Sequence, residues 1–114
     1  MGAETKSKND VVRVTAKPGI CGFSCKVEAR RIGRHTVAVE IEGSECEQAQ
    51  RLSRLLEKIT MKDLFAPVTR NPVFIAAEEA GCHPSCPIPI AILKAAEVAM
   101  NMAIPKEVLI KFRP

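Results

Sequence analysis

Five cysteines are the residues of this 114-residue chain whose type and spacing could do chemistry, and they are Cys21, Cys25, Cys46, Cys82 and Cys86. An odd number of cysteines does not suit a framework built only of disulfides. Thiolate sulfur binds zinc and iron–sulfur clusters, and it is also the form of cysteine that attacks disulfides. The cysteines therefore indicate metal binding or thiol redox chemistry.

Two of these cysteines lie where a helix is expected to begin. Residues 44–47 have the form of a capping box with Ser44 as the N-cap, which places Cys46 in the first turn of a helix. Cys86 directly precedes Pro87, where a later helix is expected to start. The first N–H groups of a helix lack partners and carry the positive end of its dipole, so both positions favour thiolate over thiol.

The segment of residues 82–87 reads Cys-His-Pro-Ser-Cys-Pro, and its prolines reduce the entropy lost when Cys82 and Cys86 converge on one ion. The spacing lies within the range of zinc pairs, and Cys-Pro also ends iron–sulfur ligand runs. Cys21, at the mouth of an expected hairpin, can turn toward the helix starts. The sequence therefore predicts a metal site that binds either zinc or an iron–sulfur cluster, with the ligands Cys21, Cys46, Cys82 and Cys86. Zinc would hold the sulfurs within roughly 3.5–4 Å of one another, whereas a cluster would spread them wider.

The remaining candidates are assigned to structure. Cys25 falls on the apolar face of a strand and is expected to pack as a small hydrophobic residue, and His83 is expected to be a loop residue. No catalytic residue is predicted, because the chain has no Gly-x-Ser-x-Gly elbow, no His-Glu-x-x-His motif and no phosphate-binding glycine loop.

Two other functions stay open at this point. In the first, Cys82 and Cys86 form a reversible disulfide, with Cys86 as the attacking thiol at the helix start and with a redox partner protein. In the second, the chain is a non-catalytic interaction module with buried cysteines. The nearly all-apolar third helix would then provide a homodimer surface.

Elements of both types are needed to position the cysteines. β-Branched residues predict a strand over residues 11–17, and period-two alternation predicts strands over 21–29 and 36–42. Apolar spacing predicts helices over 44–59, 71–81 and 89–102. A capped helical turn is expected near residues 60–65 and a final strand over residues 108–112. The order β-β-β-α-α-α-β predicts a two-layer α+β fold, with a mainly antiparallel sheet and helices on one face. Residues 1–9 are expected to be a disordered tail, and residues 10–114 one domain.

Composition excludes several classes of protein. A net charge of +4, with no Trp or Tyr, argues against a nucleic-acid-binding surface. No uninterrupted apolar run is long enough to span a bilayer, and the N-terminal residues lack the apolar region of a signal peptide. The sequence therefore predicts a cytoplasmic protein with reduced thiols and no membrane partner.

These motifs also resemble those of a known set of proteins. Ile-Cys-Gly-Phe at residues 20–23, Cys46 at a helix start, and Cys-His-Pro-Ser-Cys-Pro-Ile-Pro at residues 82–89 are similar to an uncharacterised family of small proteins from anaerobic bacteria and methanogenic archaea. The resemblance runs from about residue 11 to 112. The family pattern is Cys-Gly-Phe, one cysteine, then Cys-x-x-x-Cys-Pro-Val-Pro, with Ile88 here in the place of valine. The resemblance implies the same four cysteines and a reducing, anaerobic setting, and it implies no reaction.

Overall fold

A computed structural model describes residues 11–17, 22–42 and 45–114. The predicted tail of residues 1–9, together with Cys21 and Ser44, lies outside the described residues. The described part of the chain contains no helix that is both long enough and apolar enough to cross a membrane.

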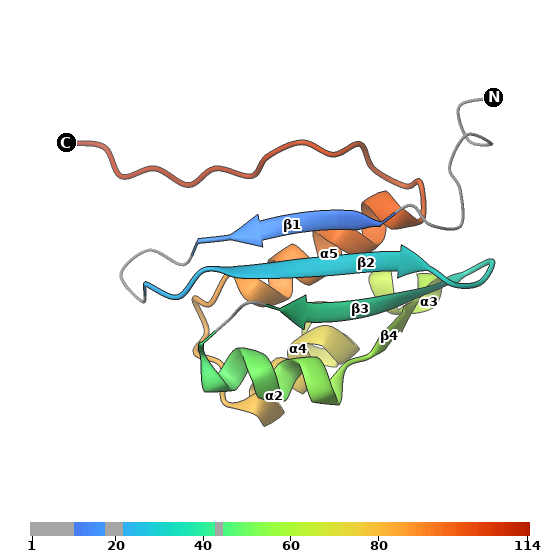
Figure 1. The fold of residues 1–114 in the computed structure, drawn as a ribbon, viewed down its shortest axis with the longest axis horizontal. Helices are drawn as coiled ribbons and strands as arrows, with labels where there is room; N and C mark the ends of the chain where they lie inside the picture. The colour runs from blue at the N-terminus through green and yellow to red at the C-terminus, as the bar shows by residue number, and fades with distance from the viewer. Residues whose placement is uncertain (1–10, 18–21, 43–44) are drawn as a thin grey trace.

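A four-stranded antiparallel sheet forms one layer of the molecule (Figure 1). Its strands follow chain order: β1 (Val12–Ala16), β2 (Cys25–Arg31), β3 (Thr36–Glu42) and β4 (Lys58–Thr60). The long hairpin of β2 and β3 is the one predicted from alternation, because each strand turns apolar residues to one face and charged residues to the other. Val27 and Val37 on the inner face are fully buried.

Helices form the second layer against this apolar face. Helix α5 (Ile88–Ala99) contacts β1, β2 and β3, and its side chains Ile92, Ala95 and Ala96 are fully buried. Helix α2 (Glu47–Leu55) lies beside β3 and packs on α4 (Pro72–Ala80) (Figure 1). The predicted two-layer α+β fold with an antiparallel sheet is therefore confirmed.

Local capping signals place the shorter helices. Thr60 and Asp63 form a reciprocal capping box at the start of α3 (Met61–Leu64), in which Thr60 N–H donates to Asp63 Oδ2 at 2.9 Å. A short 3₁₀ turn, η2 (Val68–Arg70), follows. Asn71 then caps α4, because its Oδ1 accepts from Val73 N–H at 2.9 Å. Asn71 Nδ2 also donates to the carbonyl oxygens of Asp63 and Ala66, so a single buried amide fixes the path from α3 to α4.

The prediction of a helix through residue 59 is wrong in its last part. Helix α2 ends at Leu55, and Leu56 adopts extended backbone angles. The chain then forms the unpredicted strand β4, in which Ile59 pairs with Val37 and is fully buried. The apolar spacing that suggested a helix is satisfied instead by Leu52 on α2, by Leu56 directly after the helix and by Ile59 on the strand, all of which are buried.

The prediction of a final strand over residues 108–112 is also wrong for the isolated chain. Residues 103–114, which we call the C-terminal arm, are exposed throughout and form no helix or strand. Their backbone makes no hydrogen bond to another described residue. The alternating apolar pattern is present, but no strand lies beside it to complete a ladder.

The two edges of the sheet differ. The outer edge of β3 is covered along its length: β4 pairs with residues 36–38, Val39 N–H donates to the Glu57 carbonyl at 2.9 Å, and Ile41 N–H donates to Ser53 Oγ at 3.2 Å. Strand β1 pairs with β2 on one side, and its other side has no strand partner within the described ranges.

Candidate functional site

Cys46 is the N-cap of α2. Helix α2 begins at Glu47, so Cys46 precedes the first turn instead of lying within it as the capping-box prediction has it. Its backbone angles are extended, and its side chain does not cap the helix. The Cys46 thiol donates instead to Gln48 Oε1 at 3.3 Å. The sulfur therefore lies at the positive end of the helix dipole.

Cys82 is positioned by a Schellman motif at the end of α4. Gly81 adopts a left-handed conformation with φ +85° and donates its N–H to the Glu78 carbonyl at 3.0 Å. Cys82 N–H donates to the Ala77 carbonyl at 2.9 Å, which completes the motif. The backbone of Cys82 is thereby tied to the last turn of the helix.

A tight turn brings Cys86 back toward Cys82. Cys86 N–H donates to the His83 carbonyl at 3.1 Å, with Pro84 at the second position of the turn, where its fixed φ fits. The exposed His83 ring contacts Ser85 Oγ through Nδ1 at 3.3 Å, which agrees with its assignment as a loop residue. Pro87 is the N-cap of α5, so Cys86 lies directly before the beginning of that helix.

Cys25 begins β2 opposite Ala16 and is 2% exposed. It belongs to the hydrophobic core, as the sequence predicts. The structure adds a feature that the sequence did not indicate, since this core thiol interacts with two of the predicted ligands. Burial first, and then the charges of Cys86 and Cys46, raise the pKa of Cys25 to about 11.

The same two cysteines act on Cys82. Burial is again the largest cause that raises the pKa of Cys82, followed by the charges of Cys86 and Cys46 and by a side-chain hydrogen bond to Cys86. The charge of Arg51 lowers this pKa, and the net result is a value of about 11. Cys46 and Cys86 therefore each affect the pKa of Cys25 and of Cys82, and we call these four residues the thiol cluster. In Figure 1 the beginnings of β2 and α2 and the segment leading into α5 all lie at the left end of the molecule.

The spacing of the thiols bears on what they could hold. Among the described residues, the one group of three or more potential ligand side chains whose donor atoms all lie within 4.8 Å of one another is Glu28, Glu40 and Glu42. The described thiols are therefore spread more widely than a tetrahedral zinc site requires. No disulfide joins any two of them. The fourth predicted ligand, Cys21, lies outside the described residues.

Arg51 is a residue of the site that sequence reasoning missed. Its Nε donates to the Ala80 carbonyl at 3.0 Å, which joins α2 to the end of α4 just before Gly81 and Cys82. Its positive charge lowers the pKa of Cys82, whereas burial and the neighbouring cysteines raise it. The sequence carries no signal for this role, because an arginine on the polar side of a helix is ordinarily a solvated residue.

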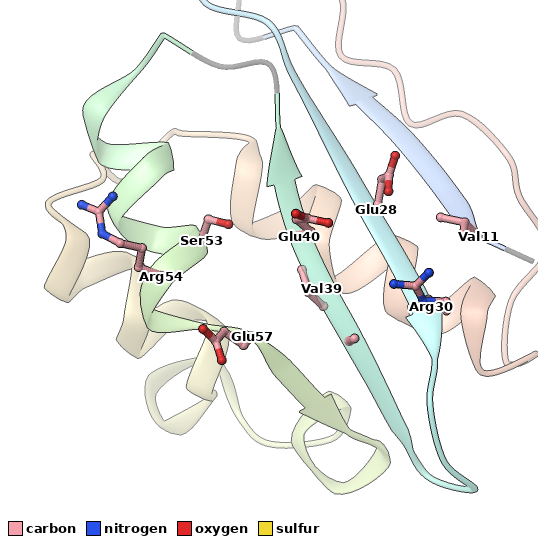
Figure 2. Close-up of a pocket in the computed structure, with 9 residues that line it drawn as sticks. Val11, Glu28, Arg30, Val39, Glu40, Ser53, Arg54 and Glu57 are labelled. Carbon is pink, nitrogen blue, oxygen red and sulfur yellow. The ribbon is translucent and has the colours of Figure 1, made fainter. Parts of the chain in front are cut away.

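The outer face of the sheet carries the glutamate group and a pocket of about 360 Å³ (Figure 2). The pocket is lined by acidic and basic side chains from β2, β3 and α2, and the Arg54 guanidinium points away from the strands. Glu28 and Glu40 are direct cross-strand neighbours, and Glu28 is paired with Arg13 at 3.2 Å. These features describe a solvated polar face with mixed charge.

Fold and site together define a small α+β protein with a thiol cluster at one end of its sheet. The chain belongs to a family that is itself described as a family of unknown function (DUF6951), whose model matches residues 12–112. No curated protein and no solved structure is significantly similar to it. The resemblance to an uncharacterised family is therefore confirmed at the level of family membership.

Proposed function

We propose that this protein binds an iron–sulfur cluster, with zinc as the alternative metal, through Cys21, Cys46, Cys82 and Cys86, and that it acts in electron transfer or redox sensing. The observation that carries the proposal is the turn that brings Cys86 back toward Cys82 against the hydrophobic core, together with the effect of distant cysteines on their pKa values. Cys46 at the start of α2 and Cys86 before α5 both act on Cys82 and Cys25. A shared cluster would require these thiols and Cys21 to lie around one centre.

The surroundings of the cluster suit a charged inorganic centre. Cys82 and Cys86 are half-buried against the hydrophobic core, so access of water to the sulfurs is limited. Cys46 and Cys86 lie at two helix starts, where the dipole suits a negatively charged centre. The Arg51 guanidinium lowers the pKa of Cys82, but burial and the neighbouring cysteines raise it to about 11, so a bound metal would have to displace the Cys82 proton. A bound cluster would supply a one-electron redox couple, whose potential responds to nearby charge and to hydrogen bonds at the sulfurs.

Iron–sulfur is preferred over zinc because of the wide spacing of the described thiols. A reducing cytoplasmic setting and a redox partner protein are part of the same proposal. Cys21 is retained as the fourth ligand because it follows the Pro18-Gly19 turn signal, whereas Cys25 is held in the core by the β1–β2 ladder.

Reconstitution of the reduced protein with ferrous iron and sulfide under anaerobic conditions tests the proposal. We expect visible absorbance together with bound iron and acid-labile sulfide. Both should be lost in Cys46→Ser, Cys82→Ser and Cys86→Ser and kept in Ser85→Ala, the matched control from the same loop. Cys21→Ser should lose the cluster and Cys25→Ala should keep it. Protein that takes up neither iron nor zinc contradicts the proposal. The non-catalytic interaction module would then be the remaining hypothesis.

The hydrogen bond between the thiols of Cys82 and Cys86 favours a second function, thiol–disulfide exchange. In that reaction the two thiols become a disulfide while a partner protein's disulfide is reduced to two thiols, so electrons and protons balance. Incubation with a disulfide substrate followed by peptide mapping would detect the Cys82–Cys86 bond. Cys21→Ser separates the two functions, because it should abolish cluster binding and leave this exchange intact.

A further inference from the structure

The C-terminal arm leaves the domain along a path that the fold fixes. Helix α5 ends in a second Schellman motif, in which Asn101 takes a left-handed conformation with φ 61° and Met102 N–H donates to the Glu97 carbonyl at 2.8 Å. Pro105 follows and prevents any continuation of the helix. The arm is therefore a defined extension of the domain, and in Figure 1 it passes outside the sheet beyond β1.

The arm exposes far more apolar surface than a solvated tail requires. Ile110 is 87% exposed and Phe112 is 99% exposed, and Ile104, Val108 and Leu109 are between 58% and 72% exposed. Contiguous exposed apolar groups of this kind mark interaction surfaces. In an extended chain Val108, Ile110 and Phe112 share one face, and charged residues occupy much of the other. The arm thus has the pattern of a strand with one face to bury.

Strand β1 offers the complementary surface. Its outer edge has no strand partner among the described residues, so a row of backbone donors and acceptors is exposed there. Its inward side chains Val12 and Val14 are only partly buried, whereas Val27 and Ala29 on the neighbouring strand are fully buried. The apolar layer between sheet and α5 is therefore incomplete at this edge, and one more strand would cover it.

We propose that the C-terminal arm of one chain adds as a fifth strand to β1 of a second copy, and that the second copy returns its own arm in the same way. A fifth strand in this position would place Val108, Ile110 and Phe112 on the same face as Val12 and Val14, above α5. The charged residues of the arm would then lie on the polar face beside Arg13.

A second copy is the occupant that satisfies both surfaces at once. Each chain carries one arm and one open edge, so a twofold axis pairs every arm with an edge and leaves neither exposed. The arm is long enough, since twelve extended residues span at most roughly 40 Å, whereas the 5 residues of β1 span about 17 Å. The arm makes no backbone hydrogen bond to the described part of its own chain, so it is available for exchange.

The test is the mass of the full chain in solution, measured by light scattering or sedimentation equilibrium over a wide concentration range. The protein is kept metal-free and reduced, so the result is independent of the thiol cluster. We expect twice the 12.4 kDa of one chain. The triple variant Val108→Ser/Ile110→Ser/Phe112→Ser should have half the mass of the wild type, whereas Glu107→Ser/Lys111→Ser, which changes the other face, should stay dimeric.

Hydrogen exchange provides an independent readout. Amide protection of β1 should fall in the triple variant while protection of β3 stays unchanged, because all three substitutions lie outside the hydrophobic core. A wild-type chain that is monomeric at every concentration overturns the proposal. So does a dimer that survives the triple substitution, or a triple variant whose β1 amides stay as protected as in the wild type.

Discussion

Replacement of Gly81 by alanine tests whether the end of α4 sets the position of Cys82. An added methyl group at Gly81 would meet Arg51 Nη2 at 3.5 Å and Gln48 Cγ at 3.8 Å, which are ordinary contacts. The effect must therefore come from the backbone, because φ is +85°. A left-handed conformation costs an ordinary residue roughly 1–2 kcal/mol. Reduced freedom of the unfolded chain returns roughly 0.4–1 kcal/mol, so the free energy of unfolding should fall by about 1 kcal/mol.

Gly33→Ala is the matched control, because Gly33 lies outside the left-handed region and a methyl group there would contact only Thr36, at 3.7 Å or more. Both substitutions restrict the unfolded chain equally, so their difference isolates the strain, about 1–2 kcal/mol. Thermal or urea unfolding of both variants measures it, at roughly 4–8 °C of melting temperature for each kcal/mol. Gly81→Asn should lie close to wild type, since asparagine tolerates this conformation.

The same substitution bears on the site. Since the Cys82 N–H bond to Ala77 completes the motif, Gly81→Ala should also lower iron content after reconstitution, whereas Gly33→Ala should not. Equal free energies of unfolding for the two alanine variants would refute the reasoning, and so would a Gly81→Asn variant as unstable as Gly81→Ala.

Three further predictions concern the core, a cap and a thiol. Leu52→Ala should lower the free energy of unfolding by about 2–5 kcal/mol because Leu52 is fully buried; Leu55→Ala on the same helix, where the side chain is 47% exposed, should cost far less in the same urea titration. Asn71→Ala should cost about 1–3 kcal/mol through the lost cap and two unpaired carbonyls. Asn71→Asp should be at least as destabilising in thermal unfolding, because its buried carboxylate keeps the cap but faces the two carbonyl oxygens; an aspartate variant as stable as wild type would contradict this. The pKa of Cys25 is raised from 9.0 to about 11 by folding, so as the pH rises the unfolded chain loses this proton before the folded chain does. The free energy of unfolding should therefore be insensitive to this thiol below pH 9 and should fall between pH 9 and 11. Urea titrations across that range should show a smaller fall in Cys25→Ala, and an unchanged slope would count against the assignment.

Much of the fold follows from signals that are local in the sequence. The hairpin of β2 and β3 is set by alternation, the start of α4 by Asn71-Pro72, and its end by Gly81. Each of these depends on neighbouring residues alone, so the chain pattern is sufficient. Strand β4 is different, because its three residues are extended only through pairing with β3. Spacing of apolar residues cannot show such pairing.

The candidate site also combines features that are local in the sequence with features that depend on tertiary packing. The positions of Cys46 and Cys86 near helix starts could be read from the sequence. The approach of Cys25 to those thiols could not, because the packing of β2 against α5 decides it. The bond from Arg51 to Ala80 likewise depends on how α2 and α4 meet. The arm shows a third case, in which the strand pattern is present and no strand lies beside it within the described residues.

The covered outer edge of β3 determines what kind of assembly this sheet permits. Open-ended fibres that grow by edge pairing need two exposed edges on every molecule, so that each unit can serve as a template for the next. Ser53 and β4 remove one of those edges, and within the described residues β1 is left as the single site of growth. Direct pairing of two exposed sheet edges can therefore only join β1 to β1 and ends with a closed pair, because β4 and the Ser53 hydroxyl group occupy the edge at which such a stack would continue.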